Sequence, residues 1–371
     1  MKLLLAFTSF LCTVNCFAQQ PQKTRNIFVI TTDGFRWQEI FQGADSALLS
    51  NPAFVLDTTL SKQMFWDSSI ALRRQKLMPF LWNVLSKQGQ LYGNRSLDNK
   101  VNVKNFYKIS YPGYNEIFSG YADIIPIFNK PVNNRNSNVL QYLNKQADFK
   151  GKVVAFSSWN IMPYILNEKH CGFSVNSGYE LLSGHDELSG LIDTLQNTIP
   201  KNKTRNDQLT YLSAKNYVEQ NHPKVMFLGL GETDEFAHEG RYDMYLQKAA
   251  AVDKMIADLW YFIQTDPFYK DNTTLVITTD HGRGNSYKTW RTHGFWAKGS
   301  GDVWLALIGP DIAPEGEMDN KQQIWQKQIA STVAFLVGAN FTAKHPVANH
   351  IVIPSGNKAG NIFLAAANPK L

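Results

Sequence analysis

The sequence contains little cysteine, with three residues in 371. Two of them, Cys12 and Cys16, lie in an apolar segment at the N-terminus, which leaves Cys171 as the single cysteine of the rest of the chain. One cysteine cannot form an internal disulfide. The hydrophobic core and any bound metal must therefore stabilise the fold.

Long apolar runs are also missing beyond the first residues. The chain begins with Met-Lys and a short apolar run, and a small residue then precedes a polar stretch, which is typical of a secretory signal. We predict a signal peptide over 1–18, cleaved near Ala18, and one domain over 19–371 that is secreted or periplasmic. A lipid anchor on Cys12 or Cys16 is the lesser alternative. No later run reaches about 18 apolar residues, so we expect no transmembrane segment in the mature chain.

Blocks of basic residues are missing as well. Lys and Arg number 37 against 31 Asp and Glu, which gives a formal charge of +6, but the basic residues are scattered. Scattered charge predicts no nucleic-acid-binding surface, whereas a positive excess suits a small anionic substrate. The composition, 44% apolar, is that of an ordinary globular protein.

Apolar, β-branched runs predict five buried strands, at 26–32, 152–157, 224–230, 273–279 and 303–308. The runs lack polar alternation, which indicates a sheet that is covered on both faces.

Segments with helical spacing separate these strands. Apolar residues recur at three and four positions over 242–264, and shorter helices are expected over 78–87 and 207–219. Strands that alternate with helices predict an α/β fold, namely a three-layer α/β/α sandwich with a largely parallel central sheet. Weaker patterning over 44–100 and 159–223 predicts cap insertions.

Three aspartates stand where predicted strands end. Asp33 and Asp280 each follow an apolar run that ends in two threonines, and Asp234 comes after the strand at 224–230. Ligands of open α/β sheets bind at the carboxyl ends of the strands, so we expect these acids to converge on one edge. A single aspartate after a strand is more often a helix cap, so only the complete set indicates a metal site.

Three histidines complete this set. His281 follows Asp280 directly, and His238 lies four residues after Asp234, which places the two on one face if the segment is helical. Imidazole and carboxylate are preferred ligands of zinc. We predict two divalent metal ions, with zinc favoured over manganese or magnesium. The predicted ligands are Asp234, His238 and His293 for one ion, and Asp33, Asp280 and His281 for the other.

These residues resemble the alkaline phosphatase superfamily, and within it the phosphodiesterase/nucleotide pyrophosphatase-like branch and its secreted bacterial relatives. The family pattern has an early Asp, a Ser or Thr nucleophile shortly before Pro, an Asp-x-x-x-His, an Asp-His-Gly and a late His-Gly. The chain matches this order over roughly residues 26–340. The matching residues are Asp33, Ser110, Asp234 with His238, Asp280 with His281, and His293.

The resemblance implies an alkaline-phosphatase-like fold, shared with sulfatases, in which Ser110 is the nucleophile. Ser110 would complete the second ligand set, and metal coordination would favour its alkoxide. Attack on a phosphate ester would give a phosphoseryl intermediate, which water then hydrolyses. A turn serine before Pro112 is the plainer interpretation of the same residue.

Two departures from the family pattern bear on the substrate. Sulfatases place Arg four residues after the residue that becomes formylglycine, whereas this chain has Tyr114, which speaks against that type. The diesterase branch places an asparagine after its nucleophile to bind a phosphoryl oxygen. The candidates for substrate contact are Asn129, Asn133 and the neighbouring Asn134, together with Arg291 beside the last histidine.

The sequence therefore predicts an exported two-zinc hydrolase of small-molecule phosphate esters. Phosphodiesterase or pyrophosphatase activity and phosphomonoesterase activity both remain open. The alternatives are a sulfatase-like hydrolase of sulfuric esters and a catalytically inactive, metal-binding member of the fold.

Overall fold

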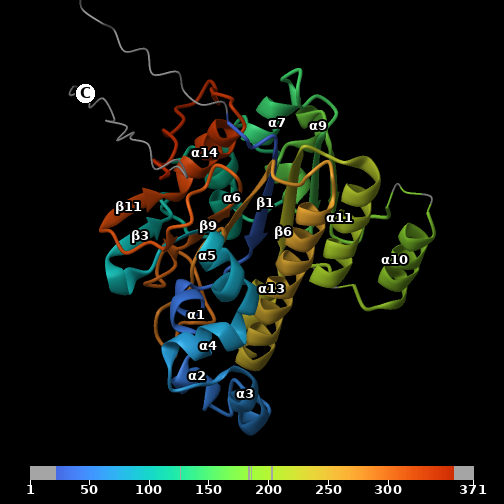
Figure 1. The fold of residues 1–371 in the computed structure, drawn as a ribbon. Helices are drawn as coiled ribbons and strands as arrows, with labels where there is room; N and C mark the ends of the chain where they lie inside the picture. The colour runs from blue at the N-terminus through green and yellow to red at the C-terminus, as the bar shows by residue number, and fades with distance from the viewer. Residues whose placement is uncertain (1–21, 126, 183, 185, 202–203, 355–371) are drawn as a thin grey trace, which may run out of the picture.

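An eight-stranded sheet forms the centre of the molecule (Figure 1). The computed structural model describes residues 22–125, 127–182, 184, 186–201 and 204–354, so the predicted signal peptide lies outside the described residues. The strand order is β10 (Gly316–Glu317), β2 (Gly89–Tyr92), β9 (Leu305–Ile308), β7 (Thr273–Thr278), β1 (Asn26–Thr32), β6 (Val225–Leu230), β4 (Val153–Ser157) and β5 (Ser174–Ser177). A second sheet contains β11 (Gln322–Trp325), β3 (Asn99–Asn102) and β8 (Asp302–Val303).

The central sheet is largely parallel. β1 pairs in parallel with both β6 and β7, and β4 pairs in parallel with β5 and β6. β9 is the exception, because it runs antiparallel to β7 and to β2. The predicted parallel sheet is therefore confirmed.

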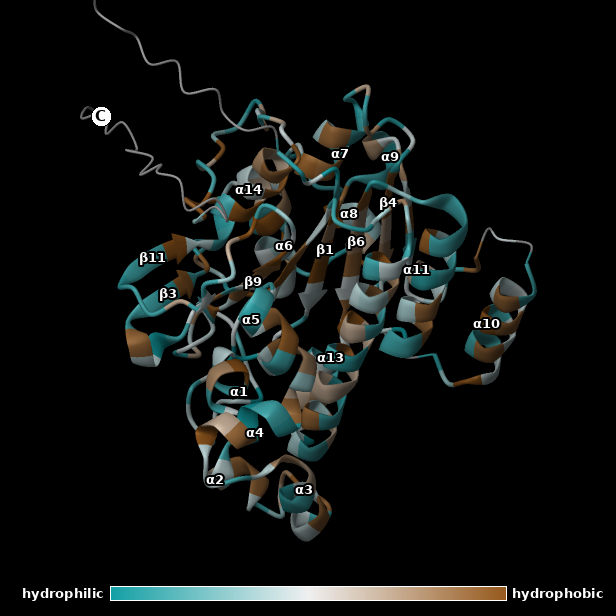
Figure 2. Ribbon diagram, viewed as in Figure 1, coloured by the Kyte–Doolittle hydropathy of each residue, from teal (hydrophilic) through white to brown (hydrophobic). Residues whose placement is uncertain are grey.

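Both faces of this sheet are buried, as the apolar strands require. Phe28 and Ile30 of β1 enter one hydrophobic cluster, whereas Ile27 and Val29 enter a second cluster on the opposite face. Figure 2 shows the central strands as mainly hydrophobic. Because successive side chains of a strand point to opposite faces, one continuous apolar strand supplies two cores.

Helices cover each face of the sheet. The first cluster includes side chains of α11 (Asp207–Asn221), α13 (Tyr242–Thr265) and η1 (Leu81–Leu85). The second includes side chains of α6 (Ser110–Ser119), α7 (Val139–Asn144) and α14 (Ile329–Leu336). These layers form the predicted three-layer α/β/α sandwich.

Two predicted elements differ from the structure. The single strand expected over 303–308 is divided at Trp304, because Val303 pairs with β3 of the small sheet while β9 pairs within the large one. The Trp304 ring is buried in the core, and its Nε1 donates to the carbonyl of Phe35 at 3.0 Å. The helix expected over 78–87 is formed by η1, a π-helix, and by α5 (Ser86–Gln88).

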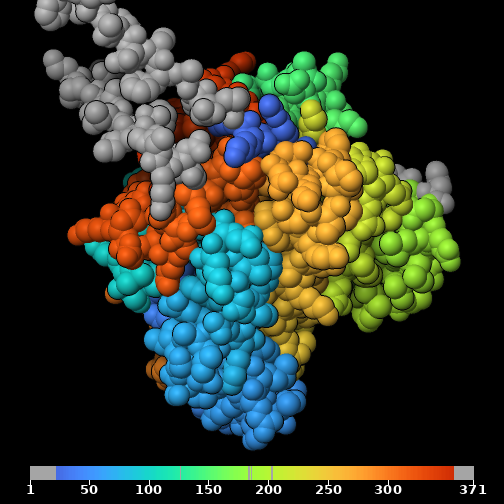
Figure 3. Space-filling view, viewed as in Figure 1, coloured from blue at the N-terminus to red at the C-terminus, as the bar shows by residue number. Residues whose placement is uncertain are grey.

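A lobe of short helices lies beyond the carboxyl ends of the central strands (Figures 1 and 3). It contains α1 (Trp37–Gln42), α2 (Ser46–Leu49), α3 (Thr58–Phe65) and α4 (Ile70–Leu77). Most of this lobe falls in the segment 44–100, which also supplies β2, β3 and η2 (Arg95–Leu97). The segment 159–223 supplies β5, α8 (Met162–Ile165), α9 (Glu168–Cys171), α10 (Glu187–Thr198) and α11. Both segments proposed as insertions therefore also contribute strands to the central sheet.

The remaining elements are α12 (Glu232–His238), which follows β6, and η3 (Gln326–Gln328), which precedes α14. Within the described ranges, no helix combines the length and the apolar character needed to cross a bilayer.

Candidate metal centre

The order of the strands brings the three predicted aspartates together. β1 lies between β6 and β7, and all three run in the same direction. Asp33 follows β1, Asp234 lies in the helix after β6, and Asp280 lies just beyond β7. Adjacent parallel strands end at one edge, so these carboxylates converge, as the sequence predicted.

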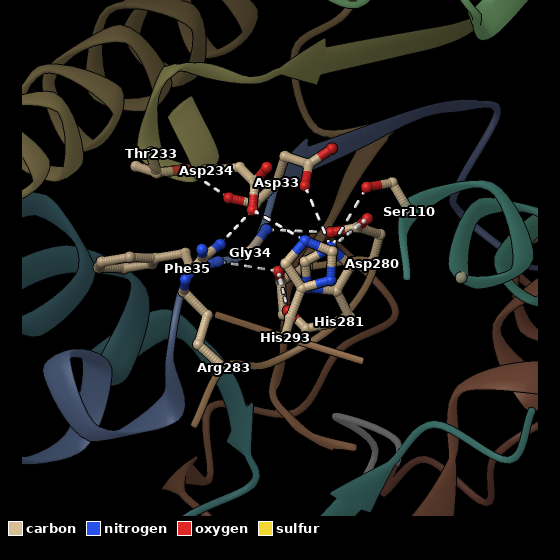
Figure 4. Close-up of polar contacts among 12 residues, drawn as sticks. Asp33, Gly34, Phe35, Ser110, Thr233, Asp234, Asp280, His281, Arg283 and His293 are labelled. Atoms are coloured by element: carbon tan, nitrogen blue, oxygen red, sulfur yellow. Dashed lines mark hydrogen bonds and ion pairs between the residues drawn. The ribbon is translucent and has the colours of Figure 1, made fainter. Parts of the chain in front are cut away.

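One cluster contains Asp33, Asp280 and His281, all buried (Figure 4). The Nε2 of His281 lies 3.5 Å from Oδ1 of Asp33 and 3.4 Å from Oδ2 of Asp280. The Oγ of Ser110 lies 3.2 Å from the same nitrogen. Four potential ligand atoms therefore face a common point.

Each of the three ligand side chains is fixed by its other polar atom. Oδ2 of Asp33 accepts a hydrogen bond from the hydroxyl of Tyr114 at 3.2 Å, and Oδ1 of Asp280 accepts one from the Gly34 N–H at 3.0 Å. The Nδ1 of His281 lies 2.9 Å from the Gly282 carbonyl, so Nδ1 carries the proton and Nε2 the lone pair. Within the described part of the chain, Oδ1 of Asp33 and Oδ2 of Asp280 are buried without a hydrogen-bond partner.

Ser110 begins α6 and is 5% exposed. The first turn of α6 packs tightly against the loop after β7, because a Cβ at Gly113 would lie 2.4 Å from the carbonyl oxygen of Asp280. The amide of Gln326 holds the two segments together by donating to the carbonyls of Gly113 and Asp280, at 3.0 and 2.8 Å. Glycine at 113 is therefore required to bring the serine hydroxyl to the cluster.

A second cluster contains Asp234, His238 and His293. α12 places Asp234 and His238 on one face, with Nε2 of His238 3.2 Å from Oδ2 of Asp234 and 3.0 Å from Nε2 of His293. The Nδ1 of His293 faces the carbonyl of Lys108 at 3.4 Å, which leaves its Nε2 as the free nitrogen. The His293 ring also stacks on His281, with centroids 3.9 Å apart, so the two clusters adjoin.

Arg283 lies between the clusters and the protein core. Arg283 is 1% exposed, and its Nη1 pairs with Oδ1 of Asp234. Its other nitrogens donate to the carbonyls of Trp290 and Arg291. Gly34, at φ +59°, makes room for this pair, because a Cβ there would lie 2.6 Å from Arg283 Nη1 and from Asp234 Oδ1.

The pKa values of the first cluster follow from its burial. Burial, followed by repulsion from Asp280, raises the pKa of Asp33 well above its usual range. Burial raises the pKa of Asp280 to about 7 and lowers the pKa of His281 to about 4. Without a cation, Asp33 and Asp280 therefore resist ionisation. The His281 imidazole stays neutral, which is the form that binds a metal.

In the second cluster, burial alone would raise the pKa of Asp234, but the Arg283 guanidinium and His238 hold it well below its usual range. Burial lowers the pKa of His293 well below its ordinary value. Asp234 is thus an anion beside neutral imidazole.

These residues fit a divalent metal ion. Two buried carboxylate oxygens without partners and one imidazole lone pair lie within 4.8 Å of one another, which is an arrangement that a cation stabilises. A second group of potential ligand atoms within the same distance contains Asp234, His281 and His293, so His281 is shared by both groups and His238 is not a member of the second. Histidine and carboxylate together suit zinc better than magnesium.

The candidate substrate residues differ in position. Oδ1 of Asn129 accepts a hydrogen bond from the Tyr111 N–H at 2.9 Å, directly after Ser110. Asn133 is half-buried further along the same loop, and Asn134 donates to the side chain of Asn115. Arg291 is exposed, with its guanidinium 5.9 Å from the Phe54 ring. Among these four residues, only Asn129 contacts the residue that follows the serine.

Tyr114 was not predicted as part of the site. It lies four residues after Ser110 on α6, so both side chains emerge on one face of the helix. Its hydroxyl accepts from Thr31 Oγ1 at 3.3 Å and donates to Asp33. The i and i+4 spacing was the available signal, but the contact with Asp33 depends on how α6 packs against the end of β1.

Replacing Tyr114 by phenylalanine is expected to weaken metal binding by roughly tenfold or more, because the hydroxyl that orients Asp33 is lost. Calorimetric zinc titration of the metal-free protein measures this change. Tyr269→Phe is the matched control, since that buried hydroxyl bonds to the carbonyl of Pro223, before the starts of β7 and β6, whereas the ligands lie beyond the ends of these strands. Equal zinc affinity in Tyr114→Phe and wild type would contradict this role.

Part of the sequence and the whole fold have counterparts among known proteins. Residues 193–323, which include Asp234, His238, Asp280, His281 and His293, match the family model described as "Metalloenzyme superfamily". No curated protein sequence matches the chain.

Solved structures agree with this class. Wild-type alkaline phosphatase PafA is 10% identical with a TM-score of 0.58, and the alignment covers 90% of this chain and 99% of PafA. The lipoteichoic acid synthase LtaP from Listeria monocytogenes is 12% identical with a TM-score of 0.54, covering 86% and 73%. A 2-O GAG sulfatase is 12% identical with a TM-score of 0.53, covering 88% and 73%. The fold is therefore that of the alkaline phosphatase superfamily, and the resemblance seen in the sequence is confirmed at this level.

Proposed function

We propose that the protein is an exported two-metal hydrolase of phosphate esters in which Ser110 is the nucleophile. The observation that carries the proposal is the convergence of the Ser110 hydroxyl with two unpartnered carboxylate oxygens and the free nitrogen of His281. A structural serine has no need of such neighbours. Asp33, Asp280 and His281 would hold one ion next to Ser110, and Asp234, His238 and His293 would hold the other.

Bound divalent ions, most favourably zinc, would supply positive charge for the phosphoryl oxygens and lower the pKa of a coordinated hydroxyl. In this proposal the chain's own residues would position the nucleophile. Ser110 stands at the N-terminus of the ten-residue helix α6, where backbone N–H groups favour an anion. Asn129 lies beside the Tyr111 N–H and provides an amide for a phosphoryl oxygen.

The proposed reaction has two displacements. Ser110 Oγ forms a bond to phosphorus while the bond to the ester oxygen breaks, and the departing oxygen ends with a proton as the alcohol. Water then attacks the phosphoserine, which releases phosphate, or a phosphate monoester if the substrate was a diester, and restores the Ser110 hydroxyl. Burial of the acids excludes bulk water from the side of the site that faces the core.

Phosphate is favoured over sulfate by the residue at position 114. In place of the arginine of formylglycine sulfatases, this chain has Tyr114, whose hydroxyl is engaged by Asp33. A serine nucleophile that keeps its hydroxyl suits phosphoryl transfer. The proposal is tested against two alternatives. One is a sulfatase-like hydrolase of sulfuric esters, and the other is a catalytically inactive, metal-binding protein.

The test is hydrolysis of an aryl phosphate monoester, an aryl phosphate diester and an aryl sulfate by zinc-loaded protein, with Ser110→Ala beside it. We expect turnover of at least one phosphate ester that depends on Ser110, and the faster of the two assigns the subclass. Turnover of the sulfate alone would support the sulfatase-like alternative. No turnover by protein that has bound two metal ions would support the inactive one.

A further inference from the structure

Five aromatic rings from three separate segments touch one another in a continuous row, which we name the aromatic wall. Its members are Phe106, Tyr107, Phe128, Phe295 and Trp296. Phe106 and Phe295 stack at a centroid distance of 3.9 Å, and Trp296 meets Phe295 at 4.6 Å. At the other end, Tyr107 contacts Phe106 at 5.5 Å and Phe128 at 5.3 Å.

The aromatic wall faces solvent instead of the core. Trp296 is 92% exposed, Phe106 57%, Phe128 50% and Phe295 39%. Neither hydrophobic core cluster includes any of the five rings. Single exposed apolar side chains are ordinary, but a contiguous group of large rings in contact with water marks a binding surface.

Two of the three segments of the wall also carry a residue of the candidate metal centre. Phe106 and Tyr107 come shortly before Ser110, and Phe295 and Trp296 come directly after the His293-Gly294 pair. A side-chain to backbone contact links these two segments, because Nδ1 of His293 lies 3.4 Å from the Lys108 carbonyl.

The third segment contacts Tyr111, the residue that follows Ser110. Phe128 precedes Asn129, whose side chain accepts from the Tyr111 N–H. All three segments of the wall are therefore tied to the residues around Ser110 and His293.

We infer that the aromatic wall binds the leaving group of the ester, and that this group contains a planar aromatic ring. The inference rests on the proposed function for the place of the phosphoryl group. Flat rings pair well with flat ligands, in offset-stacked or edge-to-face contact. Each of the three segments also contributes a lysine, Lys108, Lys130 or Lys298, which suits the anionic part of the same molecule.

A binding measurement on a variant without the proposed nucleophile tests this inference independently of catalysis. Zinc-loaded Ser110→Ala protein is titrated calorimetrically with 1-naphthyl phosphate, decyl phosphate and methyl phosphate, which share the phosphate and differ in the substituent. We expect naphthyl phosphate to bind roughly tenfold more tightly than methyl phosphate, as stacking on exposed aromatic side chains provides. Adding Trp296→Ala or Phe106→Ala should reduce this preference several-fold while methyl phosphate binding stays unchanged.

Tyr261→Ala is the matched control, because Tyr261 is also an exposed ring, 70% accessible, but lies on α13 outside the wall. Both wall positions are exposed, so folding should be retained, which circular dichroism checks. Equal binding of naphthyl and methyl phosphate, or a preference that survives both wall substitutions, would overturn the inference. Decyl phosphate binding as tightly as naphthyl phosphate would overturn it in favour of an alkyl chain.

The two proposals fail in different ways. If the wild-type protein hydrolyses the esters through Ser110, but the wall substitutions do not change the preference for naphthyl over methyl phosphate, the proposed function stands and the aromatic subsite is wrong. If a Trp296-dependent preference for the naphthyl ligand is measured but no ester is hydrolysed, the subsite stands and the proposed function is wrong. In the active enzyme, Trp296→Ala should raise KM for aryl esters, whereas Tyr261→Ala should not.

Discussion

Ser110→Ala is expected to lower kcat for phosphate ester hydrolysis by about a thousandfold or more, because no other hydroxyl among the described residues contacts the His281 ligand nitrogen. The side chain is small and its backbone helix unchanged, so the variant should fold. Steady-state kinetics on the best aryl phosphate of the panel measures the effect.

Ser137→Ala is the control for this experiment, since Ser137 is exposed and outside α6. Zinc content, measured in parallel, separates loss of the nucleophile from loss of metal. A Ser110→Ala enzyme with bound zinc and an unchanged kcat would show that another group attacks the ester.

Removal of metal is expected to abolish activity and to lower the thermal stability, most strongly at neutral pH. The pKa of Asp280 rises from 3.8 to about 7 on folding without metal, so the protonated form is the one that the fold favours. Its favourable contribution is present below about pH 4 and is lost as the pH rises towards about 7, with an upper limit of about 4 kcal/mol. The melting temperature of the chelated protein should therefore fall as the pH rises from about 4 to about 7.

Two controls test the cause of this pH dependence. Zinc should remove most of the difference at neutral pH, because the ion stabilises ionised carboxylates and binds the folded state. Asp280→Asn should make the pH dependence of the chelated protein less steep, because the amide cannot ionise, while Asp33 continues to contribute. If chelated wild type and chelated Asp280→Asn showed the same dependence on pH, the buried acid would not be its source.

The sequence predicted the elements whose signal is local. β1 was predicted at its observed bounds, 26–32, because an apolar β-branched run between polar residues leaves little choice of register. α13 was predicted to within one residue, since its apolar periodicity is long and Pro267 follows its end. The break at Trp304 could not be predicted, because it depends on which sheet each side of the tryptophan pairs with.

Part of the candidate site was predictable because it depends on where the predicted strands end. Asp33 directly follows β1, and Asp280 and Asp234 lie just beyond β7 and β6, so sheet topology alone brings them to one edge. Contacts made across the site were not visible in the sequence. The pairing of Arg283 with Asp234, and of Tyr114 with Asp33, depends on distances between segments that are far apart in the chain.

The measurement that tests the central claim most directly is mass spectrometry of zinc-loaded protein quenched in acid during turnover of an aryl phosphate. The account predicts a phosphoryl group on the peptide that contains Ser110, assigned to that residue by fragmentation and absent from Ser110→Ala. Phosphorylation at a different residue, or burst-free turnover with no labelled peptide under conditions that preserve phosphoserine, would contradict it.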